Sequence, residues 1–384
     1  MSLWLPQAFG AKPSGARLAR IERSPQYRNG RFHNPLARRS DGASLATIWE
    51  FFTGGSPHRR PTAPPPHLRR TASDFADPPE APRVTWLGHA SLLVEIDGVR
   101  ILIDPVWGER PSPFGWVGTR RFHEPPLALD DLPPLDAVLL SHDHYDHLDL
   151  PTVRALAGRV PRWITPLGVG AHLERWGVAA ERIDEFDWWD ETTVEAEGVA
   201  ARLVCTPSRH FSGRGLRDRD ATLWSGWAFV GTEQRLWYAG DSALTPQFLE
   251  VGERLGPFDL TMIEVGAYNA SWADVHLGPE QAVAAHRMAQ GPAVDGRIPG
   301  RMLPIHWGTF DLALHGWTEP AERVLAAARA AGVALALPRP GESITPEAAP
   351  DERWWPEVAW ESAADAPAIS TGLDPEVLEL VPRP

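Results

Sequence analysis

The sequence predicts an α/β (α+β) fold in which helices cover mixed β-sheets. Short apolar runs of strand length, such as "DAVLLS" and "RLWYAGD", recur from Arg83 onward. Segments with apolar residues at helical spacing, such as "GPEQAVAAHRMAQ" and "EPAERVLAAARAAGV", alternate with these runs and carry a proline in their first turn. Because strands interleaved with helices bury their apolar faces against each other, we expect layers of both kinds around one core.

The first part of the chain, residues 1–80, is predicted to be an irregular basic extension. It is rich in Pro, Arg and Gly, and the stretch "PTAPPPHLRR" is expected to be stiff. The apolar patch "LATIWEFF" predicts one short helix there. From Arg83, the segment "RVTWLGHASLLVEIDGVRILIDP" alternates apolar and polar residues on both sides of "IDG", which predicts two strands joined by a tight turn.

The remaining elements are predicted to form one main domain, residues 81–345. Residues 346–384 are predicted to be a C-terminal tail that packs on this domain. The further predicted strands are "DAVLLS", "RWITPL", "ARLVCTPS", "LWSGWAFVG", "RLWYAGD", "FDLTMIEVGA" and "RMLPIHW". The further predicted helices are "PTVRALAG", "GAHLERWG" and "PQFLEVGERLG".

The charge of the chain is uneven. A formal net charge of -13 argues against general nucleic-acid binding, yet residues 1–70 carry 12 Lys and Arg against 3 Asp and Glu. This extension is expected either to lie on the acidic body or to make peripheral contact with an anionic membrane surface. No stretch approaches the ~20 apolar residues that span a bilayer. We therefore expect a soluble cytoplasmic protein, with the inner membrane face as its alternative site.

One segment concentrates residues that bind metals. The chain has a single cysteine, Cys205, so any metal must be held by His, Asp or Glu. The stretch "SHDHYDH", directly after "DAVLL", places His142, His144, Asp146 and His147 at the end of a predicted buried strand. Burying these groups without partners costs roughly 1–3 kcal/mol each. A bound metal is the simplest partner.

Three more donors follow apolar runs, namely His210, Asp241 and His306. Counting about three protein ligands for each ion suggests two sets, with Asp241 bridging them. The first set is His142, His144 and His210; the second is Asp146, His147 and His306. Two such ions share a hydroxide at neutral pH, which predicts a hydrolase. Nitrogen-rich ligation favours two Zn²⁺, while iron and manganese also fit carboxylate-bridged sites.

The pattern H-x-H-x-D-H together with the later His, Asp and His resembles the metallo-β-lactamase fold superfamily. Within it, the chain is most similar to N-acyl phosphatidylethanolamine-hydrolysing phospholipase D and its bacterial relatives. The likeness covers roughly Val84 to Phe310. It is carried by "VTWLGHASLLVEIDGVRILIDPVW", "LLSHDHYDHLD", "YAGDSALTPQF", "GPFDLTMIEVGAYNASW", "HLGPEQAVAAH" and "LPIHWGTF". The resemblance implies an αββα sandwich and places the seven donors on the dizinc ligands of the family.

The resemblance also implies roles around the metals. Asp146 would orient the hydroxide as well as bind metal, and His276 in "DVHLGPE" would contact substrate or assist the leaving group, unless it merely caps a helix. Tyr145 and Tyr268 match positions near the substrate pocket, although a buried hydroxyl with a structural partner is the alternative for both. The histidine of "LGHAS", at position 89, is expected to hydrogen-bond rather than to ligate. Trp116, in a long loop, is expected to border the pocket.

The implied reaction cleaves N-acyl phosphatidylethanolamine to N-acylethanolamine and phosphatidate, with a phospholipid or another phosphodiester as the substrate. The sequence departs from the family at Glu264 and Val275, where an apolar or Pro residue and a polar residue are expected. These departures weaken any transfer of lipid specificity. Alternatives are a lactonase or small-molecule phosphodiesterase, a non-catalytic lipid-binding protein with a vestigial metal site, and a redox diiron protein. The family likeness also suggests a homodimer.

Overall fold

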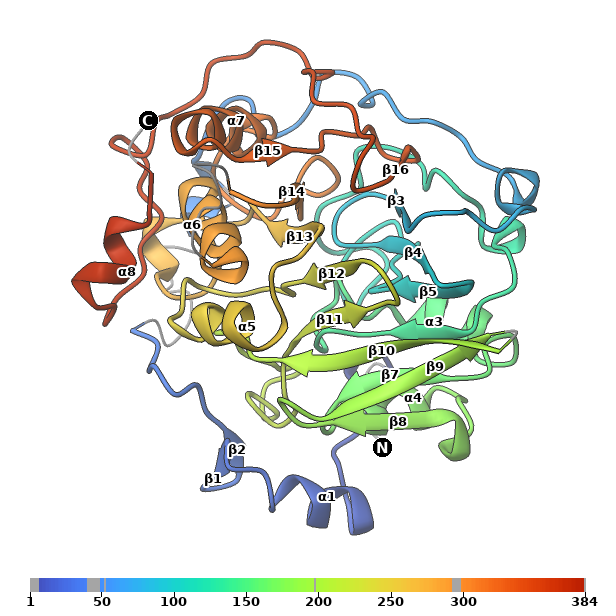
Figure 1. Cartoon of the computed structure of the whole chain (residues 1–384). Helices are drawn as coiled ribbons and strands as arrows, with labels where there is room; N and C mark the ends of the chain where they lie inside the picture. The colour runs from blue at the N-terminus through green and yellow to red at the C-terminus, as the bar shows by residue number, and fades with distance from the viewer. Residues whose placement is uncertain (1–6, 40–48, 52, 197, 292–297, 383–384) are drawn as a thin grey trace.

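Two mixed seven-stranded sheets form the centre of the fold in the computed structural model, which describes residues 7–39, 49–51, 53–196, 198–291 and 298–382. The first sheet has the order β16-β3-β4-β5-β6-β7-β8, and the second has the order β15-β14-β13-β12-β11-β10-β9 (Figure 1). The strands of the first sheet are β3 (Arg83–Trp86), β4 (Leu92–Ile96), β5 (Val99–Ile103), β6 (Ala137–Leu139), β7 (Trp163–Pro166), β8 (Ile183–Phe186) and β16 (Ser343–Ile344). Those of the second are β9 (Glu191–Ala196), β10 (Val199–Thr206), β11 (Gly226–Val230), β12 (Arg235–Tyr238), β13 (Leu260–Glu264), β14 (Arg301–Ile305) and β15 (Ala334–Leu335).

Each sheet is antiparallel in one half and parallel in the other. In the first sheet the parallel run is β5 to β8, and in the second it is β12 to β15. Parallel strands need crossover connections, and helices supply most of them. The carboxyl ends of parallel strands lie at one edge of a sheet, so the loops after them gather there.

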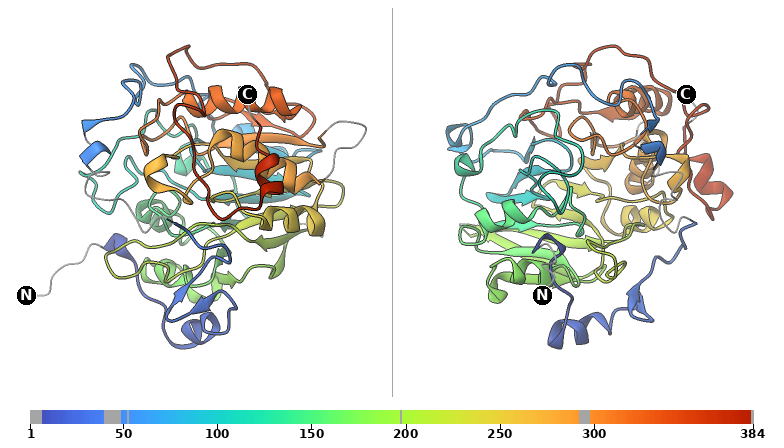
Figure 2. Two further views of the ribbon diagram at one scale, coloured as in Figure 1. Left: turned by 90° about the vertical axis from the view of Figure 1, so that its left-hand side faces the viewer. Right: turned by 180° about the vertical axis from the view of Figure 1, so that it is seen from behind.

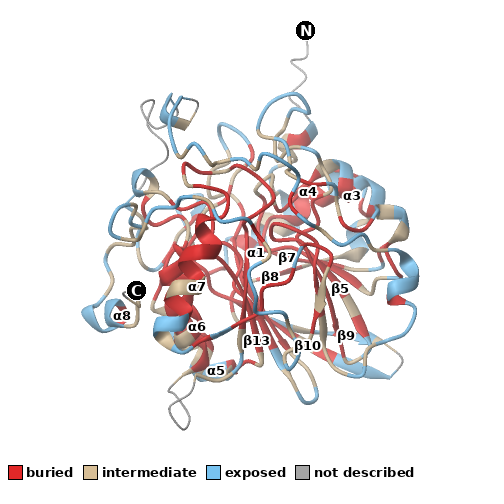
Figure 3. Cartoon of the chain, turned by 90° about the horizontal axis from the view of Figure 1, so that it is seen from above, coloured by how far each residue is buried: buried red, intermediate tan, exposed pale blue. Residues whose placement is uncertain are grey.

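Helices cover the outer face of each sheet. Figure 3 shows α3 and α4 flanking the strands on one side and α5, α6 and α7 on the other. Their bounds are α3 (Leu150–Leu156), α4 (Gly170–Arg175), α5 (Gln247–Leu255), α6 (Pro279–Gln290) and α7 (Glu319–Ala331); the short α8 (Pro375–Glu379) lies in the tail. The predicted αββα sandwich is confirmed.

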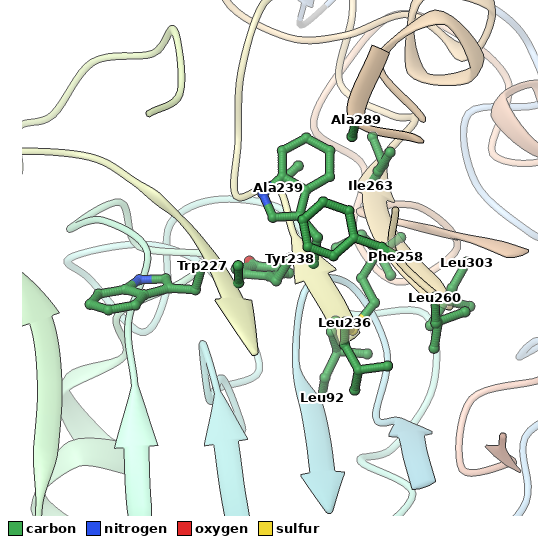
Figure 4. Packing of buried hydrophobic residues seen from close by; sticks show 14 of the residues in the cluster. Leu92, Trp227, Leu236, Tyr238, Ala239, Phe258, Leu260, Ile263, Ala289 and Leu303 are labelled. Carbon is green, nitrogen blue, oxygen red and sulfur yellow. The ribbon is translucent and has the colours of Figure 1, made fainter. Parts of the chain in front are cut away.

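The alternation of side chains along β4 explains this layering. Leu92 and Val94 belong to the large core between the sheets, whereas Leu93 belongs to a second cluster beneath α3 and α4. Successive strand residues point to opposite faces, so β4, which has apolar side chains on both faces, must be covered on both sides. In Figure 4, Leu92 lies beside Leu236, a residue of the other sheet, which shows the two inner faces meeting.

One predicted element differs from the structure. The segment "RVTWLGHASLLVEIDGVRILIDP" contains three strands, β3, β4 and β5, and not two. Gly88 has a φ of 97° and His89 a φ of 52°, so the backbone reverses between β3 and β4 in a left-handed conformation that apolar alternation cannot reveal. The tight turn predicted at "IDG" is present, because Asp97 and Gly98 also have positive φ between β4 and β5.

The basic extension lies along the outside of the body (Figure 2). It contains a 3₁₀ turn (Gln7–Phe9), α1 (Gly15–Ile21) and a hairpin of β1 (Tyr27–Arg28) and β2 (Arg31–Phe32). Its arginines at positions 17, 38 and 59 pair with the acidic side chains of Glu185, Asp220 and Asp311. These pairs favour the expectation that the extension lies on the acidic body.

Two predictions about the extension and the tail are not settled by these contacts. The helix predicted at "LATIWEFF" falls largely outside the described residues, of which residues 49–51 are helical. The divisions 1–80, 81–345 and 346–384 stay predictions. Within the part of the chain that is described, no helix has the length and apolar character needed to cross a membrane.

A buried ion pair ties the extension to the sandwich. Arg209 follows β10, and its guanidinium donates to the carbonyl oxygens of Leu36, Ala37 and Leu244. It also pairs with Asp274 at 3.0 Å, and both side chains are 0% exposed. Asp274 in turn accepts hydrogen bonds from the backbone of Arg39 and Thr371, so extension and tail meet at one carboxylate.

We predict that Arg209→Ala lowers the free energy of unfolding by about 3–5 kcal/mol, because the variant leaves a buried carboxylate without its cation. Chemical denaturation measures this change. The control is Arg202→Ala, which removes an exposed ion pair with Glu191 and should cost less than about 1 kcal/mol. Equal losses in the two variants would contradict a structural role for the buried pair.

Candidate metal centre

The seven predicted donors come from loops that follow strands of both sheets. The loop after β6 supplies His142, His144, Asp146 and His147, and it ends where Asp149 caps α3 by accepting from the backbone of Thr152. The other three donors follow β10, β12 and β14 of the second sheet; they are His210, Asp241 and His306. The structure brings all seven together at one end of the sandwich.

The first group consists of three imidazoles. The Nδ1 atom of His144 lies 2.9 Å from His142 Nε2 and 3.2 Å from His210 Nε2. Burial lowers the pKa of His144 to about 4 and holds the pKa values of His142 and His210 well below the ordinary value. All three rings are therefore neutral at pH 7.

Hydrogen bonds to the opposite ring nitrogens assign the tautomers. His210 Nδ1 donates to the carbonyl oxygen of Val275 at 2.9 Å, so its Nε2 carries a lone pair. The hydroxyl of Ser141 donates to Asp104, so His142 Nδ1 must donate to that hydroxyl, and its Nε2 also carries a lone pair. Two lone pairs thus face one nitrogen of His144, which can offer at most one hydrogen. A cation satisfies all three atoms at once.

The second group mixes imidazoles and carboxylates. Asp241 Oδ2 lies 3.2 Å from both His147 Nε2 and His306 Nε2, and Asp146 Oδ2 lies 3.5 Å and 3.3 Å from the same two atoms. Burial opposes charge on the rings, yet Asp241 and Asp146 raise the pKa of His306 to about 10 and that of His147 well above its ordinary value. Burial likewise opposes ionisation of the two carboxyls, but the imidazoles hold their pKa values well below the usual range.

Several atoms of this group lack hydrogen-bond partners among the described residues. They are His147 Nε2, His306 Nε2 and Asp241 Oδ2, all of them buried. Such atoms are rare in folded proteins unless an ion or water meets them. The same Asp241 oxygen lies 3.9 Å from His142 Nε2 and 3.8 Å from His210 Nε2, so one carboxylate faces both groups. The donors therefore fit two cations with Asp241 between them.

Asp104 fixes the position of the metal loop, residues 141–147, by accepting hydrogen bonds from it. Its Oδ2 accepts from His147 Nδ1 at 2.7 Å and from the hydroxyl of Tyr238 at 2.5 Å, besides the hydroxyl of Ser141. This contact leaves the Nε2 of His147 directed at the second group. Asp104 is not identified from the sequence as part of the site. Its position directly after β5, the neighbour of β6, is the only sequence feature that indicates this role, and a single aspartate in "LIDP" forms no motif.

His89 contacts one of the predicted ligands and belongs to a group of donors that could hold a metal, so its exclusion from the ligands stays a prediction. Its Nε2 lies 2.9 Å from Asp146 Oδ2, and its ring centroid lies 4.0 Å from that of His306. Burial lowers the pKa of His89 to about 3, so the neutral ring donates to the Asp146 carboxylate. The side chain fixes the orientation of a predicted ligand.

His276 lies between the two groups. Its ring centroid is 5.2 Å from that of His210 and 5.3 Å from that of His306, and its side chain is 14% exposed, whereas most of the donors are buried. Its Nδ1 is 2.7 Å from Glu264 Oε2. Glu264 is wholly buried at the end of β13, where its other oxygen accepts from the backbone of Ser242 and Leu277. Burial and the nearby charge of Asp241 raise the pKa of Glu264.

The side chain of Glu264 and the backbone of Val275, the two departures from the family pattern, both contact histidines of the site. Glu264 is the partner of His276, and the backbone of Val275 orients His210. The sequence indicated Glu264 only as an unusual residue, because its pairing with His276 depends on how the loop after β13 returns to the site.

The three remaining predicted residues make other contacts. The hydroxyl of Tyr145 donates to the carbonyl oxygen of Arg214. Tyr268 donates to Glu319 at 2.7 Å and borders a cavity of about 630 Å³ together with residues of the extension and the tail. Trp116 is 79% exposed. None of these contacts involves the seven donors, so the substrate-binding roles of Tyr145, Tyr268 and Trp116 stay predictions.

The fold and the donor set define a metal-dependent hydrolase of the metallo-β-lactamase fold. Residues 99–307 match the model of the beta-lactamase superfamily domain, and the chain belongs to this superfamily. A solved structure with the same fold is that of Igni18, a metallo hydrolase from Ignicoccus hospitalis. It matches with a TM-score of 0.50 and 21% sequence identity, over 69% of this chain and 98% of that one.

Two relatives are similar to this chain over different shares of its length. An uncharacterized protein of Mycobacterium tuberculosis is 46% identical over 356 residues, which cover 89% of each chain. The N-acyl-phosphatidylethanolamine-hydrolyzing phospholipase D 1 of Caenorhabditis elegans is 37% identical over 236 residues, which cover 59% of this chain and 64% of that relative. The second similarity is therefore partial in both proteins.

We predict that the purified protein retains two divalent ions per chain and that His210→Ala loses one of them, because the first group then keeps only two nitrogens. Asp241→Asn should lose more, since both groups face that carboxylate. Inductively coupled plasma mass spectrometry after dialysis measures the content. The control is His286→Ala, which removes a buried histidine that contacts Thr261 outside the seven donors. Loss of metal in the control alone would contradict the assignment.

Proposed function

We propose that the protein is a zinc-dependent phosphodiesterase of the phospholipase D type that cleaves N-acyl phosphatidylethanolamine to N-acylethanolamine and phosphatidate. The observation that carries the proposal is the pair of donor groups on either side of Asp241, whose shared carboxylate fits two ions. The partial similarity to the nematode phospholipase D supports the substrate. A nitrogen-rich donor set supports zinc over magnesium or calcium.

The metals would be held by His142, His144 and His210 on one side and by Asp146, His147 and His306 on the other. Two divalent ions in such a site lower the pKa of water and neutralise negative charge on a phosphoryl group. The side chains of the protein orient the reacting groups. Asp146, held by His89, presents a carboxylate oxygen that accepts a proton from the attacking water.

His276 is placed to serve the leaving group. Glu264 accepts from its Nδ1, which keeps the ring in one orientation and leaves Nε2 for a substrate atom. Water adds its oxygen to phosphorus and gives a proton to Asp146 while the bond to the ethanolamine oxygen breaks. That oxygen takes a proton from solvent, or from Nε2 of His276 when the ring carries a second proton besides the one on Nδ1 that Glu264 accepts. The products are the alcohol and phosphatidate, so the atoms balance.

A lactonase or small-molecule phosphodiesterase is the second candidate function. The observation that favours it is Glu264, a buried carboxylate beside the mouth of the site where an anionic phosphodiester would approach. A neutral lactone would not be repelled by that charge. The side-by-side comparison of an N-acyl phospholipid with lactones and small phosphodiesters decides between these substrate classes.

We predict that the zinc-loaded protein releases N-acylethanolamine from micellar N-acyl phosphatidylethanolamine and that Asp146→Asn lowers the rate on the order of 100-fold or more, because the amide accepts no proton. Chromatography of the released amide measures the rate. The control His286→Ala should retain it. A protein that holds two ions but releases nothing would contradict the phospholipase proposal and move the assignment to lactones or small phosphodiesters.

We predict that Glu264→Gln lowers kcat about 10-fold to 100-fold while leaving the metal content unchanged. The amide group can accept from His276 or from the backbone of Ser242 and Leu277, but not from both sides as the carboxylate does. The pH–rate profile should shift together with kcat, because the orientation of His276 changes. An unchanged kcat and profile would show that the Glu264–His276 contact is only structural.

A further inference from the structure

Four arginines line an open hollow outside the seven donors. Arg60 comes from the extension, and Arg110, Arg120 and Arg121 come from the long loop between β5 and β6. The hollow has a volume of about 420 Å³ and is also bordered by Phe122. None of the seven donors lines it.

The acidic partners available to these arginines are too few to neutralise them. Arg60 pairs with Asp311 at 2.8 Å, but Asp311 also pairs with Arg59 at 2.9 Å. Arg120 pairs with Glu109 on the surface, where both side chains are more than half exposed and the pair is weak. Within the described part of the chain, Arg110 and Arg121 form no ion pair. The hollow is therefore a positive region on a chain whose formal charge is -13.

Two of the guanidinium groups also have unused donors. The Nε atoms of Arg110 and Arg121 are buried and have no hydrogen-bond partner among the described residues. The guanidinium of Arg121 has one long hydrogen bond, 3.5 Å to the carbonyl oxygen of Trp107. Burial lowers the pKa of Arg121 to about 10, although the charges of Asp149 and Glu124 oppose this shift. Buried charged donors normally have a partner.

The hollow lies close to the metal centre but is separate from it. The Arg121 guanidinium is 5.6 Å from the centroid of the Phe310 ring, and that ring is 5.2 Å from the ring of His89. Phe310 thus stands between the arginines and the residue that holds Asp146. Phe114, Trp116 and Val117, on the same loop as three of the arginines, are exposed apolar side chains.

We propose that this hollow binds a phosphate-type anion, supplied either by free phosphate or by the headgroup of a phospholipid. The planar fork of each guanidinium matches two oxygens of a phosphate group, and four such groups face one space. A headgroup would be joined there by contact of the exposed apolar loop with lipid. The proposed binding takes place outside the metal centre, so its test does not depend on whether the proposed reaction is correct.

The experiment measures binding to the zinc-loaded full chain with two probes. Isothermal titration follows inorganic phosphate, and co-sedimentation follows vesicles of phosphatidylcholine with and without phosphatidate. Arg110→Gln/Arg121→Gln should weaken binding of the effective probe at least about tenfold, which corresponds to 1.4 kcal/mol, while the metal content stays the same. The control Arg202→Gln/Arg254→Gln removes two arginines that do not line the hollow and should change nothing.

A second double variant guards against a folding defect in the first. Arg60→Gln/Arg120→Gln changes two side chains that are each 68% exposed, and it should also weaken binding. Binding of phosphate alone identifies a soluble anion, and binding only to vesicles with phosphatidate identifies a headgroup; either supports the proposal. Binding of neither probe, or binding that is lost in His210→Ala but retained in both arginine variants, would overturn it.

Discussion

Buried lone pairs that face one another are the constraint on which the structure depends. His142 and His210 direct tautomer-fixed nitrogens at His144, and Asp241 directs one oxygen at four imidazoles. The three neutral imidazoles of the first group cannot satisfy one another, and Asp241 Oδ2 has no hydrogen-bond partner among the described residues, so cations between the donors would satisfy both groups. The two sheets of the sandwich supply the donors from the ends of their strands: β6, β12 and β14 belong to the parallel runs, whereas β10, which precedes His210, is antiparallel to both of its neighbours.

The contacts around the donors make this geometry rigid. Asp104 joins β5, the metal loop and β12 through Ser141, His147 and Tyr238. On the opposite side, Asn34 of the extension donates to the backbone of His210 and accepts from Trp224. The extension is therefore part of the support of the metal centre, and a fold of the sandwich alone would leave His210 with fewer contacts.

The sequence predicted the donors because each of them directly follows an apolar strand, and strand ends meet in a sandwich. It predicted neither the hydrogen bond from Asp104 nor the pairing of Glu264 with His276, because a single carboxylate has no spacing pattern. The direction of Tyr268, toward Glu319, depends on the loop backbone and not on periodicity. The division between β3 and β4 was missed from the sequence, because it depends on the left-handed turn at Gly88 and His89. The arginine hollow joins residues 60 and 110–121, which only tertiary contacts bring together.

The most direct test of the central claim is anomalous X-ray diffraction from crystals of the zinc-loaded protein, recorded above and below the zinc absorption edge. Two peaks are expected, one among His142, His144 and His210 and the other among Asp146, His147 and His306, with Asp241 between them. A single peak, or peaks only at surface residues, would contradict a two-metal centre.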